Sequence, residues 1–389
     1  MADVVVLKER VEIDPDKPLP EYDLPNAKAF SAVARKEGGV EMIAYVCNPD
    51  VPLRFEAVEQ MRSFTGLGLI RFVEWGVVFW GPQRRRLMVI VYETPVGGRM
   101  LRGSETTIEP YSEDRLIKHF LNPVIALMRD MSARGVTHRA IRVNNLFYSD
   151  KARKHLILGD CLTAPPGLNN DPLFEPLEQG MADPSARGAG GVGDDVYALG
   201  VIVIFLTLGK LPRLTMDPIE AINRKISQGS YGVLTAGARI PASVVELLRG
   251  MLSDDPRERW SLREIELWLG GRRLTPKQPK LPNKAARPMM VGGVAGDNPR
   301  TVAEALARNW LIAPEIVRGQ DFDNWVRRSL GDDRVLENVN KVLGSAAVIQ
   351  SVPEADNQKL VTRACMALDP PAPIRHKGFS AFMDGVGHA

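Results

Sequence analysis

The feature that most constrains the fold is a polar loop followed by two short apolar runs, all within residues 136–162. The loop is His138 to Asn145, and the runs are Leu146 to Tyr148 and Leu156 to Leu158. A polar, basic turn separates the runs, and two short apolar strands around such a turn are typical of a β-hairpin. The sequence therefore predicts a hairpin that is preceded by the loop and followed by Asp160.

The loop resembles the catalytic loop of protein kinases, whose loose pattern is His-Arg-Asp-x-Lys-x-x-Asn. Against this pattern Ala140 stands in the place of the catalytic aspartate, and Arg142 in the place of the lysine. Asn145 stands in the place of the metal-binding asparagine. Asp160 begins a stretch that resembles the Asp-Phe-Gly metal motif with its last two residues changed. The resemblance is to a degenerate, bacterial-type member of the protein kinase superfamily, and it implies a kinase whose chemistry has been removed.

Two further stretches resemble the same family and follow in the family's order. Asp194 to Gly200 resembles the start of the kinase F-helix. The aspartate of that helix holds the backbone of the catalytic loop in the family, and the resemblance implies this role for Asp195. Asp254 to Ser261 resembles the family's Asp-Pro-x-x-Arg-x-Ser/Thr turn, which implies a structural ion pair for Arg259.

The resemblance also implies structural roles around the loop itself. His138 and Arg139 match the family's His-Arg pair, in which the histidine packs beneath the loop. The equivalent of Arg259 binds a glutamate at the end of the activation segment in the family. Both Glu175 and Glu178 stand at that end here, and the sequence leaves the choice between them open.

The missing groups carry a physical meaning, because phosphoryl transfer relies on positioning and electrostatic stabilisation. A positioned general base is worth roughly 10²–10⁴ in rate, and Ala140 has no oxygen for this role. Glu41 to Cys47, where the phosphate-binding lysine is expected, contains no lysine or arginine. Tyr22 to Arg35, where a glycine-rich loop is expected, contains no glycine, although close backbone approach to phosphate favours glycine. We therefore expect no phosphoryl transfer, and weak or absent binding of ATP and Mg²⁺.

Two retained residues leave two hypotheses open. Asn145 and Asp160 together offer oxygen atoms that suit Mg²⁺. Alternatively, Asn145 hydrogen-bonds to the backbone of its own loop, as asparagine commonly does in turns, and Asp160 accepts from nearby amides. We expect the structural roles, because Mg²⁺ at such a place normally needs nucleotide phosphates to complete its coordination shell.

The order of predicted elements matches a two-lobed, kinase-like domain with an added tail. Residues 1–25 are predicted to be an extended arm. Strands, one helix and further strands in residues 26–96 resemble a kinase N-lobe, and residues 97–271 turn helical as in a C-lobe. Residues 272–296 are rich in proline and basic side chains and predict an extended linker. Residues 297–389 are predicted to be a helical tail, so the expected class is α+β.

The tail carries aromatic residues that a disordered extension would lack. Trp310, Phe322 and Trp325 lie at spacings that suit helical faces. One hypothesis makes the tail a docking module with these residues as interaction anchors, since aromatic residues are enriched among such anchors. The other has the tail fold back and complete the core of the C-lobe.

Composition narrows the location and the partners. The chain has 389 residues with a formal net charge of +3, too mild to imply nucleic acid. Cys47, Cys161 and Cys365 lie far apart, and an odd count without metal-ligand spacing argues for a reducing cytoplasm. The longest apolar run, Ala198 to Leu208, is shorter than the roughly 18–20 residues that cross a bilayer, so we expect a buried helix and no membrane span.

These observations predict a catalytically inactive pseudokinase that acts as a scaffold or regulator by binding proteins. The expected partner is an active kinase, a phosphatase or a multiprotein complex. Two alternatives stay open at this point. One is an atypical enzyme that transfers a nucleotide or phosphoryl group with a metal held by Asp160 and Asn145. The other is a sensor that binds a small molecule in the vestigial nucleotide cleft.

Overall fold

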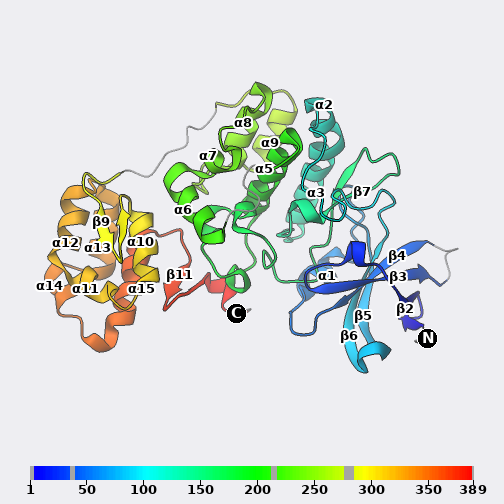
Figure 1. Ribbon diagram of the computed structural model, residues 1–389, viewed down its shortest axis with the longest axis horizontal. Coiled ribbons are helices and arrows are strands. Elements are labelled where there is room, and N and C mark those ends of the chain that lie inside the picture. The colour runs from blue at the N-terminus through cyan, green and yellow to red at the C-terminus, as the bar shows by residue number, and fades with distance from the viewer. Residues whose placement is uncertain (1–3, 36–39, 212–216, 276–283, 388–389) are drawn as a thin grey trace.

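The computed structural model describes residues 4–35, 40–211, 217–275 and 284–387, and it has three parts (Figure 1). A strand-rich N-lobe, residues 4–93, comes first. A helical C-lobe follows in residues 99–275, and a smaller tail domain, residues 284–387, comes last. An N-terminal sheet followed by a helical part is consistent with the kinase-like fold that the resemblance implied.

The N-lobe is built on one antiparallel sheet with the strand order β1-β2-β3-β4-β6-β5. Its strands are β1 (Val5–Leu7), β2 (Val11–Pro18), β3 (Ala27–Ala34), β4 (Glu41–Cys47), β5 (Phe72–Trp80) and β6 (Arg85–Glu93). The sheet curls so that its two edge strands, β1 and β5, come into contact. Lys8 and Arg10, which follow β1, both form ion pairs with Glu74 of β5 at 3.1 Å. The curled sheet encloses its own apolar cluster. Its largest members are Ile13, Met42, Trp80 and Leu87.

The expected extended arm over residues 1–25 is wrong, because Val5–Leu7 and Val11–Pro18 are strands of this sheet. The inward alternation in β2 is short and is interrupted by prolines. The pairing register with β3 shifts between Ile13 and Pro18, which is where prolines are tolerated in strands. The N-lobe therefore begins near residue 5 and not at residue 26. Residues 36–39, between β3 and β4, lie outside the described residues.

The other face of the sheet packs on helix α1 (Phe55–Met61) and on the C-lobe. Ala57, Val58 and Met61 of α1 are buried beside Ile43, Tyr45 and Ile90 of the sheet. Strand β4 is consequently buried on both faces after its first residue. This explains its continuous apolar sequence, since alternation is expected only where one face meets water.

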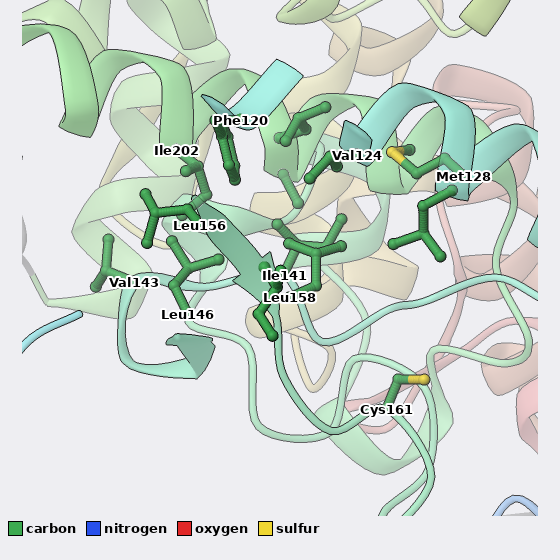
Figure 2. Close-up of a cluster of buried hydrophobic side chains, with 14 of the residues drawn as sticks. Phe120, Val124, Met128, Ile141, Val143, Leu146, Leu156, Leu158, Cys161 and Ile202 are labelled. Carbon is green, nitrogen blue, oxygen red and sulfur yellow. The ribbon is translucent and has the colours of Figure 1, made fainter. Parts of the chain in front are cut away.

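The C-lobe contains the predicted hairpin, with β7 (Leu146–Tyr148) paired antiparallel to β8 (Leu156–Leu158). Its central helix, α5 (Val192–Leu208), is buried over most of its length, as expected for a helix that is apolar on all sides. The remaining helices are α2 (Glu113–Leu116), α3 (Asn122–Ala133), α4 (Leu177–Gly180), α6 (Pro218–Gln228), α7 (Ser230–Thr235), α8 (Ala242–Met251) and α9 (Leu262–Leu269). Figure 2 shows the hairpin side chains Leu146, Leu156 and Leu158 gathered with Val124 of α3 and Ile202 of α5.

The tail domain begins earlier than expected and is not only helical. Residues 289–296, predicted to belong to a linker, form the hairpin of β9 (Met289–Val291) and β10 (Val294–Gly296). Residues 276–283 of that linker lie outside the described residues. The other elements are α10 (Pro299–Arg308), α11 (Ala313–Arg318), α12 (Gln320–Asn324), α13 (Asp333–Leu343), α14 (Ala346–Gln350), α15 (Asn357–Leu368), β11 (Ile374–His376) and β12 (Phe379–Ala381).

Neither hypothesis for the tail describes it fully, because the tail domain has an apolar core of its own and also contacts the C-lobe. That core shares no residue with the main core. Helix α10 packs against α6, and the hydrogen bonds of the contact come from residues 374–385, which we call the strap. Figure 1 shows the strap reaching back to the C-lobe. Asp183 donates its amide to Ser380 at 2.9 Å, and Phe382 donates its amide to Ala186 at 3.0 Å. The tail is thus a separate domain that the strap joins to the C-lobe.

We predict that a chain ending at Thr275 still folds, because the tail core and the main core are separate. Its thermal midpoint should fall by roughly 4–8 °C, as expected for a loss of about 2 kcal/mol. The loss comes from uncovering Leu177, Met181 and Ile222, which form a small apolar cluster beside the tail. Differential scanning calorimetry of both chains measures it. Aggregation, or a melt without a cooperative transition, would show that the C-lobe cannot fold without the tail.

Candidate functional site

The loop that resembles the kinase catalytic loop is held by the start of helix α5. The carboxylate of Asp195 accepts hydrogen bonds from the backbone amides of His138 at 2.6 Å and Arg139 at 2.7 Å. This is the contact that the resemblance implied for Asp195. Burial raises the pKa of this carboxyl group to about 6, against the lowering effect of Arg139 and of the two amides. Arg139 itself adopts a positive φ of 54°, a conformation that costs energy for a residue with a side chain.

His138 lies beneath the loop and bonds at both ring nitrogens. Its Nε2 lies 3.2 Å from the carbonyl oxygen of Gly159, and its Nδ1 accepts from the amide of Ala140 at 3.2 Å. These partners fit a neutral ring with its proton on Nε2, because Nδ1 faces a donor. Burial, with the nearby charge of Arg54, lowers the pKa of His138 to about 3. The ring is therefore a structural part and not a proton carrier near neutral pH.

Two buried ion pairs hold the segment from Asp160 to Glu178. Arg139 binds the carboxylate of Glu175 at 2.8 Å, and both side chains are fully buried. Arg259 binds Glu178 at 2.9 Å. The choice that the sequence left open is therefore decided: Glu178 is the partner of Arg259, and Glu175 serves Arg139. The amide of Asn170 also donates to Glu175, at 2.8 Å.

Asn145 and Asp160, the retained metal-site residues, are engaged by the chain itself. The side-chain amide of Asn145 donates to the carbonyl oxygens of Ala140 at 2.9 Å and Asp160 at 2.8 Å. The carboxylate of Asp160 accepts from the hydroxyl groups of Tyr92 and Thr163, each at 2.5 Å. It also accepts from two backbone amides, those of residues 162 and 163. Both oxygens of Asp160 are thus occupied, whereas a cation would need them free.

Two tyrosines that carry no sequence motif lie on neighbouring strands of the N-lobe sheet. One is on β4, where the phosphate-binding lysine was expected, and the other is on β6. Tyr45 on β4 is fully buried, and its hydroxyl group makes no hydrogen bond within the described residues. Tyr92 on β6 is also buried, and the two rings pack edge to face at 5.8 Å. Burial raises the pKa of both phenols, so both stay neutral. The sequence offered one indication of this cluster, namely Tyr45 within the otherwise apolar run of β4.

The loop between β2 and β3, residues 19–26, occupies the place where a glycine-rich loop was expected. We call it the plug. Its Tyr22 ring stacks on Phe147 with 6.2 Å between centroids and 6° between planes. Arg99 donates to the carbonyl oxygens of Tyr22 at 2.9 Å and Asp23 at 2.8 Å, which ties the plug to the C-lobe. The loop is therefore held inward by side-chain contacts and is not open around a phosphate.

A small cavity borders the loop and the segment that follows Asp160, and no residue of the plug lines it. The cavity lined by His138, Ala140, Arg142 and Asp160 measures about 10 Å³. A cavity needs roughly 10–15 Å³ to hold even one water molecule. A nucleotide with Mg²⁺ does not fit these residues, because the oxygens of Asp160 are engaged and β4 carries no lysine.

The proposed interaction anchors of the tail lie in different surroundings. Phe322 and Trp325 are buried in the tail core, 1% and 3% exposed. Their expected role as exposed anchors is wrong, because helical spacing places them on the face that fills the domain's own core. Trp310 is half-buried. Two side chains of the strap meet its ring: the ring of His376 lies at 6.2 Å, and the ammonium group of Lys377 lies over its face at 5.2 Å. Trp310 therefore supports the strap.

The described residues contain no group of three or more histidine, cysteine or acidic side chains placed to hold a metal ion. Cys47, Cys161 and Cys365 are free and buried, and burial raises the pKa of each thiol. Among the described helices, none is both long enough and apolar enough to cross a bilayer.

Comparisons with known proteins point in the same direction as the fold. No protein-family model matches the chain. The chain is similar to Serine/threonine-protein kinase 40 of Xenopus tropicalis, with 26% identity over 151 residues, which cover 38% of this chain and 34% of that protein. The Homo sapiens protein of that name is 25% identical over 146 residues, covering 36% and 33%. Sperm motility kinase 1 of Mus musculus is 24% identical over 158 residues, covering 40% and 32%.

The chain thus spans about a third of the length of the curated relatives it matches. These weak and partial similarities, together with the N-terminal sheet and the helical part that follows, suggest a protein-kinase-like superfamily. The relatives named here are animal proteins, so they give no support to the expectation of a bacterial type.

We predict that His138 makes the fold sensitive to acid. The unfolded chain takes up a proton at this ring near pH 6.5, whereas the folded chain does so only near pH 3. The unfolded state therefore binds more protons between these values. The contribution of the neutral ring to stability is complete above pH 6.5 and falls with the pH by up to about 1.4 kcal/mol per unit.

Urea unfolding at pH steps from 7 to 4 measures this slope. His138→Gln keeps a donor for Gly159. It should lower the pH dependence of the free energy of unfolding by up to about 1.4 kcal/mol per pH unit, the effect of one proton. His376→Gln, at an exposed position on β11, is the matched control and should leave the slope as in the parent chain. Equal slopes in the parent and in His138→Gln would contradict the assigned protonation state.

Proposed function

We propose that this chain is a pseudokinase, a kinase-like domain that transfers no phosphate and acts by binding other proteins. The observation that carries the proposal is the occupied cleft. Tyr22 stacks on Phe147, and Tyr92 bonds to Asp160, so side chains of the chain itself fill the space between the lobes. A filled cleft of this kind stabilises the domain, because each aromatic ring removes a large apolar area from water.

The chemistry of the loop supports the same proposal. Ala140 offers no general base, and β4 offers no cation for phosphate oxygens. Arg142 is buried without an ion pair among the described residues, and its positive charge stands near Asp160. In kinases these parts act together, and losses in such units are not additive. Restoring a single group is therefore insufficient to restore transfer.

A protein-binding role is supported by the permanent order of the segment from Asp160 to Glu178. Its two buried ion pairs, Arg139–Glu175 and Arg259–Glu178, need no phosphate to form. Thr163 is the only hydroxyl side chain in the segment, and it is 3% exposed and bonded to Asp160. The segment thus offers a fixed surface to a partner, which we propose to be an active kinase, a phosphatase or a multiprotein complex.

The two alternative functions have less support. An atypical transferase with a metal at Asp160 and Asn145 would have to break the hydrogen bonds from Tyr92 and Thr163 first. A sensor that uses the old nucleotide cleft would have to displace the plug and its contacts with Arg99. Both changes leave buried polar groups without partners unless the ligand replaces them.

We predict that neither ATP nor GTP, with Mg²⁺ or Mn²⁺, binds the parent chain at concentrations up to about 1 mM. Titration calorimetry and thermal shift measure this directly, because a ligand that binds only the folded state raises its midpoint. Tyr22→Ala, which removes the stacked ring, should still bind weakly, since no lysine on β4 holds the phosphates. A dissociation constant near the micromolar level typical of enzyme substrates would overturn the proposal.

A transfer assay completes this test. Ala140→Asp should incorporate no more labelled phosphate than the double variant Ala140→Asp, Asp160→Ala, which serves as its control. Incorporation above that background would show that the positioning of phosphates is intact and would favour the atypical enzyme.

We predict further that partner binding does not depend on phosphorylation of this chain. A protein partner that copurifies with the full chain in stoichiometric amount should remain bound after phosphatase treatment of the chain. The reason is that Glu175, and not a phosphate, meets Arg139. Loss of the partner after treatment, with modified Thr163 in the untreated chain, would contradict the fixed-surface hypothesis.

A further inference from the structure

A second cavity lies between the C-lobe and the tail domain, away from the cleft between the lobes. It measures about 610 Å³, within the usual range for small-molecule sites, which also favour domain interfaces. Helix α6 and the turn at residues 254–257 form one wall. The start of α10 and the end of α15 form the other. We propose that this cavity binds a small organic anion, a carboxylate or phosphate monoester on an apolar body.

The acidic side chains of the cavity are already engaged. Asp369 accepts from Nε of Arg300 with both oxygens, at 3.0 and 3.1 Å. Asp254 accepts from the amide of Ser230 at 2.8 Å and from its hydroxyl group at 2.5 Å. Asp255, which is exposed, accepts from the amide of Arg257 at 2.9 Å. The carboxylates of Asp369 and Asp254 therefore have hydrogen-bond partners within the protein, whereas Asp255 is exposed.

The basic side chains keep donors for a ligand. Arg300 uses Nε on Asp369, and its two terminal nitrogens make no hydrogen bond within the described residues. Arg257 is exposed, and its guanidinium group forms no ion pair with any residue that the structure describes. A guanidinium group presents paired donors that match carboxylate and phosphate oxygens. Two such groups, one from each domain, line this cavity.

The rest of the wall suits an apolar body. Leu177 and Ile226 come from the C-lobe, and Leu368 and Pro371 come from the tail. Lys225 lies beneath the wall and gives no free donor, because it binds the carbonyl oxygens of residues 172, 173 and 175. A ligand held by both walls would also reinforce the contact between the tail domain and the C-lobe.

Titration of the full chain with matched aromatic probes tests this site. Phenyl phosphate and benzoate are the anionic probes, benzamide is the neutral match of benzoate, and inorganic phosphate lacks the apolar body. We expect one or both aromatic anions to bind and to raise the thermal midpoint. Benzamide and inorganic phosphate should bind at least about tenfold more weakly, since each lacks one of the two recognised parts.

The variants locate the binding. Arg257→Gln, at an exposed position, should weaken the aromatic anion about tenfold. Arg263→Gln, an exposed arginine on α9 outside the cavity, is the matched control and should not change it. If phenyl phosphate alone binds, the site recognises phosphate monoesters, and if benzoate alone binds, it recognises carboxylates. The proposal is overturned if no probe binds at millimolar concentration, if benzamide binds as well as benzoate, or if Arg257→Gln binds like the parent.

Discussion

The hydrogen bonds from the loop amides to Asp195 are the contact on which the rest of the domain depends. Helix α5 is apolar on all sides and is fixed at the centre of the C-lobe, so its first turn is a rigid support. Asp195 transmits that position to His138 and Arg139. Arg139 in turn binds Glu175, and the ring of His138 meets Gly159. Burying a carboxylate is costly unless donors surround it, and here the donors are the very groups whose position it fixes.

The loop that Asp195 holds borders the cleft between the two lobes, and side chains of the protein itself pack in that cleft. An enzyme of this architecture needs space, free carboxylate oxygens and a cation between its lobes. This chain places tyrosine rings there, and their hydroxyl and carbonyl contacts join the two lobes through Asp160 and Arg99. The lobes are thus held together by side-chain packing, where a nucleotide would otherwise contact both. A domain organised in this way has a fixed outline, which is what the proposed binding role requires.

Local patterns in the sequence predicted the local structure well. The hairpin at residues 146–158 follows from two short apolar runs and a polar turn. The start of α5 was expected at Asp194, and the helix begins two residues earlier, at Val192, with Gly191 as its N-cap. The contacts of the cleft were not predictable in this way, because Tyr92 and Asp160 lie 68 positions apart and no periodicity links them. Trp325 shows another limit: helical spacing identifies an apolar face, but it does not tell whether that face meets a partner or the domain's own core. The strands in residues 5–18 were missed because prolines interrupt a short alternation.

The strap has a consequence for how the chain is made. Ser380 bonds to Asp183, which precedes it by 197 positions. The C-lobe leaves the ribosome long before the strap is synthesised, and at about 5–20 residues per second the delay is on the order of ten seconds or more. During that interval the surface beside Asp183, with the apolar side chains of Leu177 and Met181, lacks the cover that the tail domain later gives it. The nascent protein therefore passes through a stage in which this patch is open to chaperones or to other nascent chains.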